Sequence, residues 1–167
     1  MPPPLRAAAG LGIGYRPIAD ADLPFLARVY ASTRMEELAR TGWPEPMVLQ
    51  FLAQQFALQH SHYMEHYLTA EWLVIERAGT PVGRLYIDQW ESEVRIVDIA
   101  LLPEARGGGI GGAILADVIA EAERLGKPLT IHVEQNNPAM TLYRRLGFEK
   151  TGEHGVYHLM ERRPGRG

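Results

Sequence analysis

The chain has 167 residues, a formal net charge of −3 and no cysteine. This length predicts one domain with a real core, and the slightly acidic balance argues against a nucleic-acid partner. Without cysteine there are no disulfides, thiolate metal ligands or cysteine nucleophiles, which fits a cytoplasmic protein. No apolar run approaches the ~20 residues that span a bilayer, so no membrane partner is expected.

The sequence contains no internal repeat and no linker that would divide it. We expect a single domain over residues 11–162, with flexible termini at 1–10 and 163–167. A short strand is predicted over 12–18, and Asp20 or Asp22 can cap the helix that follows. After a break at 41–44, a second helix is predicted from apolar residues that roughly keep a helical period, which are Val48, Phe51, Leu52, Phe56 and Leu58.

Three strand-like runs follow at 72–75, 82–90 and 94–102. The turns between them are short, which predicts an antiparallel meander. The run 94–102 is apolar on nearly both faces, so it is expected to lie in the centre of the sheet.

The second half predicts a helix over 113–125, with Gly126 at its C-cap. The strand at 129–133 should run parallel to 94–102, because a helix separates the two. Asn137 and Pro138 are typical of a helix start, and the residues after Gly147 predict a final hairpin. The predicted fold class is therefore α+β, with a mixed, mostly antiparallel sheet and helices on its faces.

The most informative segment is Arg106-Gly107-Gly108-Gly109-Ile110-Gly111-Gly112, which lies between the run 94–102 and the helix at 113–125. Glycines allow a backbone to approach an anion closely, and the free N–H groups of a helix start point at it. The helix dipole adds partial positive charge at the same place. The segment therefore predicts a site for a phosphorylated ligand.

Two sequence blocks carry a resemblance to a known family. Residues 99–111, with sequence IALLPEARGGGIG, resemble the acetyl-CoA signature of the GNAT superfamily of N-acetyltransferases. Residues 136–148, with sequence NNPAMTLYRRLGF, resemble the second motif of that family, and the two blocks have the family's order and separation. The resemblance is strong over 94–160 and covers the first half only in the order of its elements.

The resemblance implies a sheet of about seven strands that splays into a V between the fourth and fifth strands, with helices on both faces. Acetyl-CoA would enter this V as co-substrate, held by main-chain groups of the central strand and by N–H groups of the glycine segment. The residues that the resemblance places at acetyl-CoA are Ile99, Ala100, Leu101, Arg106, Gly107, Gly108, Gly109, Ile110, Gly111, Gly112, Asn136 and Tyr143. One departure is Gly108, where relatives often carry Lys or Arg, so one cation near the phosphates is lost.

The resemblance implies that Tyr143 is the general acid that protonates the leaving thiolate. A phenol with a pKa of about 10 matches a thiol near 8.5 tolerably well. Tyr143 also shares a helix face with Leu142 and Leu146, which is equally typical of a core residue.

A base must take a proton from the attacking amine, and Asp98 is the first candidate because it interrupts an apolar strand. The same position fits a structural acceptor for a neighbouring loop, and the residues alone leave both roles open. Glu134 and His132 are weaker candidates for the base.

Two further groups of polar residues have simpler interpretations. His60, His62 and His66 predict a solvated helix face or pocket rim, so no metal is expected. In the family that the sequence resembles, the region between the first two helices closes over the acceptor, and here it contains Arg34, Glu36, Glu37 and Trp43. Ordinary surface charge with one packed Trp also explains these residues.

The resemblance thus implies an N-acetyltransferase that moves an acetyl group to a primary amine by direct attack in a ternary complex. The alternative is a non-catalytic acyl-CoA-binding or sensing module with the same fold. A Rossmann-type nucleotide binder fits poorly, since the glycine segment follows a later strand and alternating strand–helix units are missing. A small molecule or a peptide could supply the amine, and the sequence leaves a homodimer open.

Overall fold

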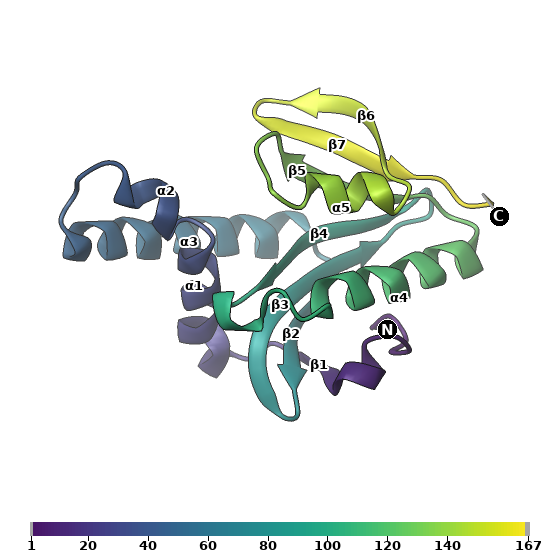
Figure 1. The fold of residues 1–167 in the computed structure, drawn as a ribbon, viewed down its shortest axis with the longest axis horizontal. Coiled ribbons are helices and arrows are strands. Elements are labelled where there is room, and N and C mark those ends of the chain that lie inside the picture. The colour runs from purple at the N-terminus through teal and green to yellow at the C-terminus, as the bar shows by residue number, and fades with distance from the viewer. Residues whose placement is uncertain (1, 166–167) are drawn as a thin grey trace.

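A computed structural model describes residues 2–165 and contains one seven-stranded sheet. The sheet order is β1-β2-β3-β4-β5-β7-β6, and the β4–β5 pair is parallel whereas the other pairs are antiparallel (Figure 1). The strands are β1 (Ile13–Pro17), β2 (Glu71–Arg77), β3 (Thr80–Gln89), β4 (Val94–Leu101), β5 (Leu129–Glu134), β6 (Glu149–His154) and β7 (Tyr157–Arg162). The helices are α1 (Leu23–Ser32), α2 (Met35–Ala39), α3 (Glu45–His66), α4 (Ile110–Leu125) and α5 (Met140–Arg145). This arrangement confirms the predicted mixed α+β fold.

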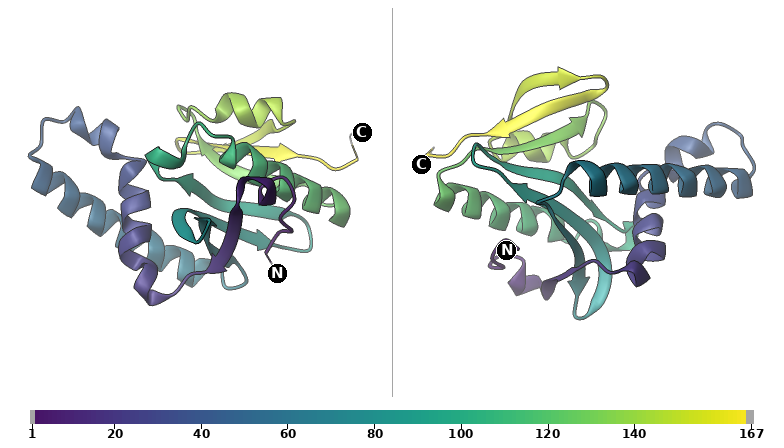
Figure 2. Two further views of the ribbon diagram at one scale, coloured as in Figure 1. Left: turned by 60° about the horizontal axis from the view of Figure 1, so that its bottom comes forward. Right: turned by 180° about the vertical axis from the view of Figure 1, so that it is seen from behind.

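The helices cover the two faces of the sheet separately. Helices α4 and α5 lie on one face, and α3 crosses the other face (Figure 2). The larger core joins the sheet to α4 and includes Leu85, Ile96 and Ile114, all of which are fully buried. A second core joins α1 to α3 through Leu26, Tyr30, Val48, Leu52 and Phe56. No helix within residues 2–165 is both long enough and apolar enough to cross a bilayer.

A β-bulge in β4 decides which face each of its side chains meets. Tyr86 of β3 pairs with Asp98, whereas the next residue, Ile87, pairs with Ile96, so Val97 is the extra residue. Residues opposite each other in an antiparallel pair share a face, and a strict two-residue alternation would place Ile96 and Asp98 on the same side. The bulge instead sends Ile96 into the core under α4 and Asp98 to the face with α1 and α3.

The sheet forks between β4 and β5. Their parallel pairing joins Val94–Ile96 to Leu129–Ile131 and goes no further. Beyond these three pairs the strands diverge, and the open V lies beside the start of α4 (Figure 1). This fork is the V expected between the fourth and fifth strands.

The chain preceding β1 is attached to α4 through a buried carboxylate. The N–H groups of Arg6, Ala7 and Ala8 donate to the oxygens of Asp117 at 2.8–3.0 Å, and Asp117 is 4 % exposed. A carboxylate that accepts three main-chain bonds is well compensated for its burial. The three donor residues lie before residue 11, outside the domain bounds of 11–162 expected from the sequence. Those bounds stay a prediction.

Several local details differ from the expectations. Residues 35–39 form the short helix α2, which no motif indicated, and Leu58 points to solvent, although its place in the helical period suggested burial.

The helix ends also differ from the expectations at two of three places. Asp22 precedes α1 but accepts hydrogen bonds from Ala19 and Arg16 and does not cap the helix. Asn137 caps a turn by accepting the N–H of Ala139 at 2.8 Å, so α5 begins at Met140. The predicted C-cap at Gly126 is confirmed, with φ of 68°.

We expect Gly83→Ala to destabilise the protein, because a Cβ at this position in β3 would lie 2.3 Å from the Ala100 carbonyl oxygen and 2.8 Å from Leu101 Cδ2. The free energy of unfolding should fall by about 1–3 kcal/mol in urea denaturation. The control is Gly14→Ala in β1, where a Cβ meets nothing within 4 Å. Equal stability of the two variants would contradict the close approach of β3 to β4.

Candidate active site at the fork of the sheet

The glycine segment presents unpaired N–H groups at the mouth of the fork. Gly107 and Gly109 have φ of 81° and 85°, conformations that favour glycine strongly. Gly109 is the N-cap of α4, and no side chain caps this helix end. Within residues 2–165, the N–H groups of 107–109 make no hydrogen bond, and those of the first helical turn are free by geometry. Arg106 is an exception, since its N–H donates to Pro103 at 3.2 Å.

The edge of β4 that faces the fork is open where its pairing with β5 has ended. The N–H of Leu102 donates to the Val82 carbonyl at 2.8 Å, which places alternate residues of β4 toward β3. Ala100 therefore bonds toward β3, whereas the main-chain groups of Ile99 and Leu101 point into the fork. The Arg106 side chain donates to the Leu101 carbonyl at 3.1 Å and links this edge to the glycine segment.

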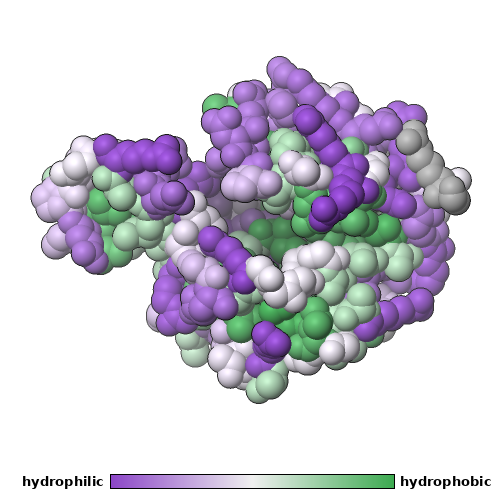
Figure 3. Space-filling view, in the orientation of Figure 1, coloured by the Kyte–Doolittle hydropathy of each residue, from purple (hydrophilic) through white to green (hydrophobic). Residues whose placement is uncertain are grey.

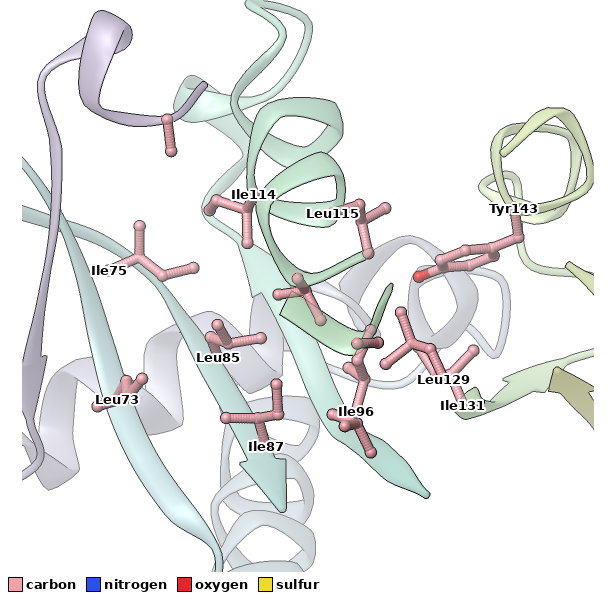
Figure 4. Packing of buried hydrophobic residues seen from close by; sticks show 14 of the residues in the cluster. Leu73, Ile75, Leu85, Ile87, Ile96, Ile114, Leu115, Leu129, Ile131 and Tyr143 are labelled. Carbon is pink, nitrogen blue, oxygen red and sulfur yellow. The ribbon is translucent and has the colours of Figure 1, made fainter. Parts of the chain in front are cut away.

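The fork forms a hollow with apolar residues at its floor, visible in the centre of Figure 3. The hydroxyl of Tyr143, on α5, points toward Leu115 of α4 and Leu129 of β5 (Figure 4). The side chain is buried and contacts Phe148 edge to face at 5.6 Å. Burial, assisted by the negative charge of Asp98, raises the pKa of the Tyr143 hydroxyl to about 12. The hydroxyl is therefore protonated at neutral pH and can donate a hydrogen bond.

Asp98 forms an ion pair with a buried arginine. Its carboxylate accepts from Arg84, a β3 residue whose side chain is 3 % exposed and which also donates to Gln59 of α3 at 3.0 Å. The guanidinium lies 4.9 Å from the ring centroid of Tyr86. Arg84 belongs to no recognisable motif, and the sequence did not identify it as a candidate site residue. The only signal was a charged residue within the predicted strand at 82–90.

The end of β5 carries a second carboxylate–arginine pair. Glu134 accepts from Arg34, which follows α1, at 2.9 Å. Its neighbour His132 lies 3.4 Å from the Arg95 guanidinium, and burial together with that charge lowers the His132 pKa. Asn136 lies exposed in the turn after β5. Asp98 and Glu134 therefore stand on opposite arms of the fork.

The remaining candidate residues lie on α3 and α2. The rings of His62 and His66 stack at 4.1 Å on the surface of α3, while His60 stacks on Phe56. The described residues include no group of three or more His, Cys, Asp or Glu side chains that could hold a metal ion. Glu36 and Glu37 lie in the first turn of α2, and Trp43 is 43 % exposed.

Comparisons with known proteins agree with this geometry. The sequence profile of the Acetyltransferase (GNAT) domain matches residues 69–150, which include the fork, the glycine segment and Tyr143. A mycothiol acetyltransferase of Brachybacterium faecium is 29% identical in an alignment of length 164 that covers 89% of this chain and 49% of that protein. The chain thus spans about half the length of this relative. The peptidyl-lysine N-acetyltransferase YjaB of Escherichia coli is 24% identical over 140 residues, which are 84% of this chain and 74% of YjaB.

Solved structures share the fold at lower identity. The PaiA N-acetyltransferase of Thermoplasma acidophilum, solved in complex with coenzyme A, superposes with a TM-score of 0.66 at 18% identity, covering 90% of this chain and 98% of that one. PH1933 of Pyrococcus horikoshii also superposes with a TM-score of 0.66, at 20% identity, and the match covers 92% of this chain and 99% of the PH1933 chain.

The forked sheet, the glycine segment at a helix start and the profile match together define an acetyltransferase fold. The chain belongs to the GNAT superfamily of acetyltransferases. The resemblance found in the sequence is therefore confirmed.

We expect Arg84→Met to lower the free energy of unfolding by about 3 kcal/mol, because it leaves the Asp98 carboxylate without its buried partner. The double variant Arg84→Met/Asp98→Leu should recover most of this loss. The matched control is Arg124→Met, which breaks an exposed pair with Glu121 and should change stability by less than about 0.5 kcal/mol. A double variant no more stable than Arg84→Met alone would contradict the coupling of these two residues.

Proposed function

We propose that the chain transfers an acetyl group from acetyl-CoA to a primary amine, by direct attack within a ternary complex. The observation that carries this proposal is the meeting of three features at one fork: free N–H groups of the glycine segment, the open edge of β4, and the Tyr143 hydroxyl. Each feature supplies a group that a thioester of coenzyme A needs.

The residues present fit acetyl-CoA. N–H groups from Gly107 to Gly112 would receive the diphosphate at the positive end of the α4 dipole. Main-chain groups of Ile99 and Leu101 would hold the pantetheine arm and the thioester carbonyl, and Asn136 would contact that arm at the end of β5. Binding of this kind positions the thioester and costs little reorganisation during the reaction.

The transfer requires that two protons be handled. A base first removes one proton from the ammonium group, the neutral nitrogen attacks the thioester carbonyl carbon, and the C–S bond then breaks as the C–N bond is retained. Tyr143 would donate its hydroxyl proton to the departing sulfur and regain one from the cationic nitrogen. Because burial keeps this phenol protonated, it is suited to donation and unsuited to act as a resident base.

We assign the base to Asp98 in preference to Glu134 and His132. Asp98 lies close enough to Tyr143 for its charge to act on that hydroxyl, and its carboxylate is held in place by Arg84. A structural acceptor that only neutralises Arg84 is the competing role. The pH dependence of the rate separates the two roles.

The alternative function is a non-catalytic module that binds or senses acyl-CoA. Such a module would bind acetyl-CoA without turning it over. Thiol release with a panel of primary amines decides between them, and binding without turnover of any amine would favour the sensor.

Three further expectations stay predictions. A homodimer would cover the exposed apolar residues Trp43 and Met47, and the mass in solution, measured by light scattering, decides it. The single domain over 11–162 is tested by limited proteolysis, which should leave that segment intact. The cytoplasmic location is tested by fractionation of the source cells.

We expect Gly109→Ala to weaken acetyl-CoA binding at least about tenfold in calorimetry, because it strains the backbone that presents the N–H groups. Gly126→Ala is the control, since this residue has φ of 68° at the other end of the same helix. Both variants should lose about 1–2 kcal/mol of stability, and only the first should lose affinity. If wild-type protein shows no binding at millimolar acetyl-CoA, the proposed function is wrong.

Tyr143→Phe should lower turnover about 100-fold while acetyl-CoA affinity stays within a factor of two to three, since only a proton donor is removed. Steady-state thiol release and calorimetry measure the two quantities. Unchanged turnover would remove Tyr143 from the mechanism and leave it as a core residue.

Asp98→Asn should lower turnover at neutral pH and make the rate rise more steeply with pH, because without the carboxylate only amine that is already deprotonated in solution can attack. The profile is measured from pH 6 to 9 at saturating acetyl-CoA. A profile that keeps its shape at reduced stability would assign Asp98 a structural role only.

A further inference from the structure

Two ion pairs meet at one aromatic ring beside the fork. The guanidinium carbon of Arg34 lies 5.4 Å from the Tyr30 ring centroid, and that of Arg84 lies 6.0 Å from the same centroid. Arg34 pairs with Glu134 on the β5 arm, and Arg84 pairs with Asp98 on the β4 arm. The cluster therefore contains two positive and two negative groups and is neutral as a whole.

The two pairs differ in how easily a ligand can replace a partner. The side chain of Arg84 is 3 % exposed and is fixed by Gln59 as well as by Asp98. The side chains of Arg34 and Glu134 are 30 % and 38 % exposed. The Arg34 Nε, like the Nε and Nη1 of the inaccessible Arg84, is buried and has no hydrogen-bond partner among the described residues. Arg34 thus keeps unused donor capacity beside an ion pair that solvent can reach.

A ligand that carries only an ammonium group fits this cluster poorly. Its ammonium would replace Arg34 as the partner of Glu134. The Arg34 guanidinium would then stay half-buried over Tyr30 without a counter-ion, and an unpaired buried charge is costly in free energy. A ligand that carries both an ammonium and a carboxylate can exchange both charges at once. Because the paired atoms of Arg34 and Glu134 are 2.9 Å apart, the best match is a ligand whose own two charges are adjacent.

We propose that the acceptor is a free α-amino acid, with its carboxylate bound by Arg34 and its ammonium bound by Glu134. This inference rests on the proposed function and names the acceptor of the same site. The guanidinium fork of Arg34 suits a planar carboxylate, and Glu134 at the end of β5 would bring the amine to the open side of the fork. An amine that lacks a neighbouring carboxylate, such as a lysine side chain within a protein, would leave Arg34 unpaired.

The test compares the free L-amino acids, assayed singly by thiol release with acetyl-CoA, with the corresponding amino-acid amides. The amides keep the amine and lose the carboxylate charge. We expect at least one amino acid to be acetylated with kcat/KM about 100-fold above that of its amide. Arg34→Gln should lower kcat/KM for the amino acid about 100-fold and raise that for the amide, because no guanidinium is then left unpaired, and so bring the ratio close to one.

The matched control is Arg28→Gln, which removes a positive charge from an exposed position on α1, the helix that precedes Arg34, and should preserve the ratio. Acetyl-CoA affinity, measured by calorimetry, shows that each variant is folded and should stay unchanged. The inference is overturned if amide and amino acid react equally well, if Arg34→Gln slows both alike, or if no free amino acid is acetylated although acetyl-CoA binds. Failure of wild-type protein to bind acetyl-CoA would instead overturn the proposed function.

Discussion

The site depends on the loss of hydrogen bonding between β4 and β5 after three residue pairs. A main-chain group that leaves its ladder must find another partner, because an unpaired buried N–H or C=O is costly. Past Ile96, the edge of β4 meets the Arg106 side chain at the Leu101 carbonyl and is otherwise open to solvent or to a bound chain-like ligand. The fork also brings the start of α4 and the hydroxyl of Tyr143 to the same opening, although they come from different parts of the chain.

The bulge at Val97 adds a second constraint. It keeps Ile96 in the apolar core under α4 and turns Asp98 toward Arg84 on the opposite face. The extra residue therefore keeps the face under α4 apolar and places the Asp98 carboxylate on the face with α1 and α3. A carboxylate on the α4 face would have met only aliphatic side chains, where it has no partner and a high desolvation cost.

Local chemistry made part of this structure predictable. Gly109 and Gly126 occupy left-handed positions at the two ends of α4, and connectivity alone required β5 to run parallel to β4. The pairs Arg84–Asp98 and Arg34–Glu134 could not be predicted, since they depend on side-chain placement across the sheet. The second pair joins residues 100 apart in the chain, and the first requires the bulge, which shifts the register of β4. Asn137 and Pro138 were expected to start the helix, but Asn137 accepts the N–H of Ala139 within a turn, and α5 begins only at Met140.

The two faces of the sheet carry separate apolar clusters, one under α4 and one between α1 and α3. Tyr30, on which both arginines rest, belongs to the second cluster, whereas the glycine segment is anchored to the first through Ile110. Sequence drift in α1 and α3 can thus reshape what is accepted without loosening the machinery that holds the acyl donor. Such a division lets a lineage keep its acyl donor while the acceptor changes.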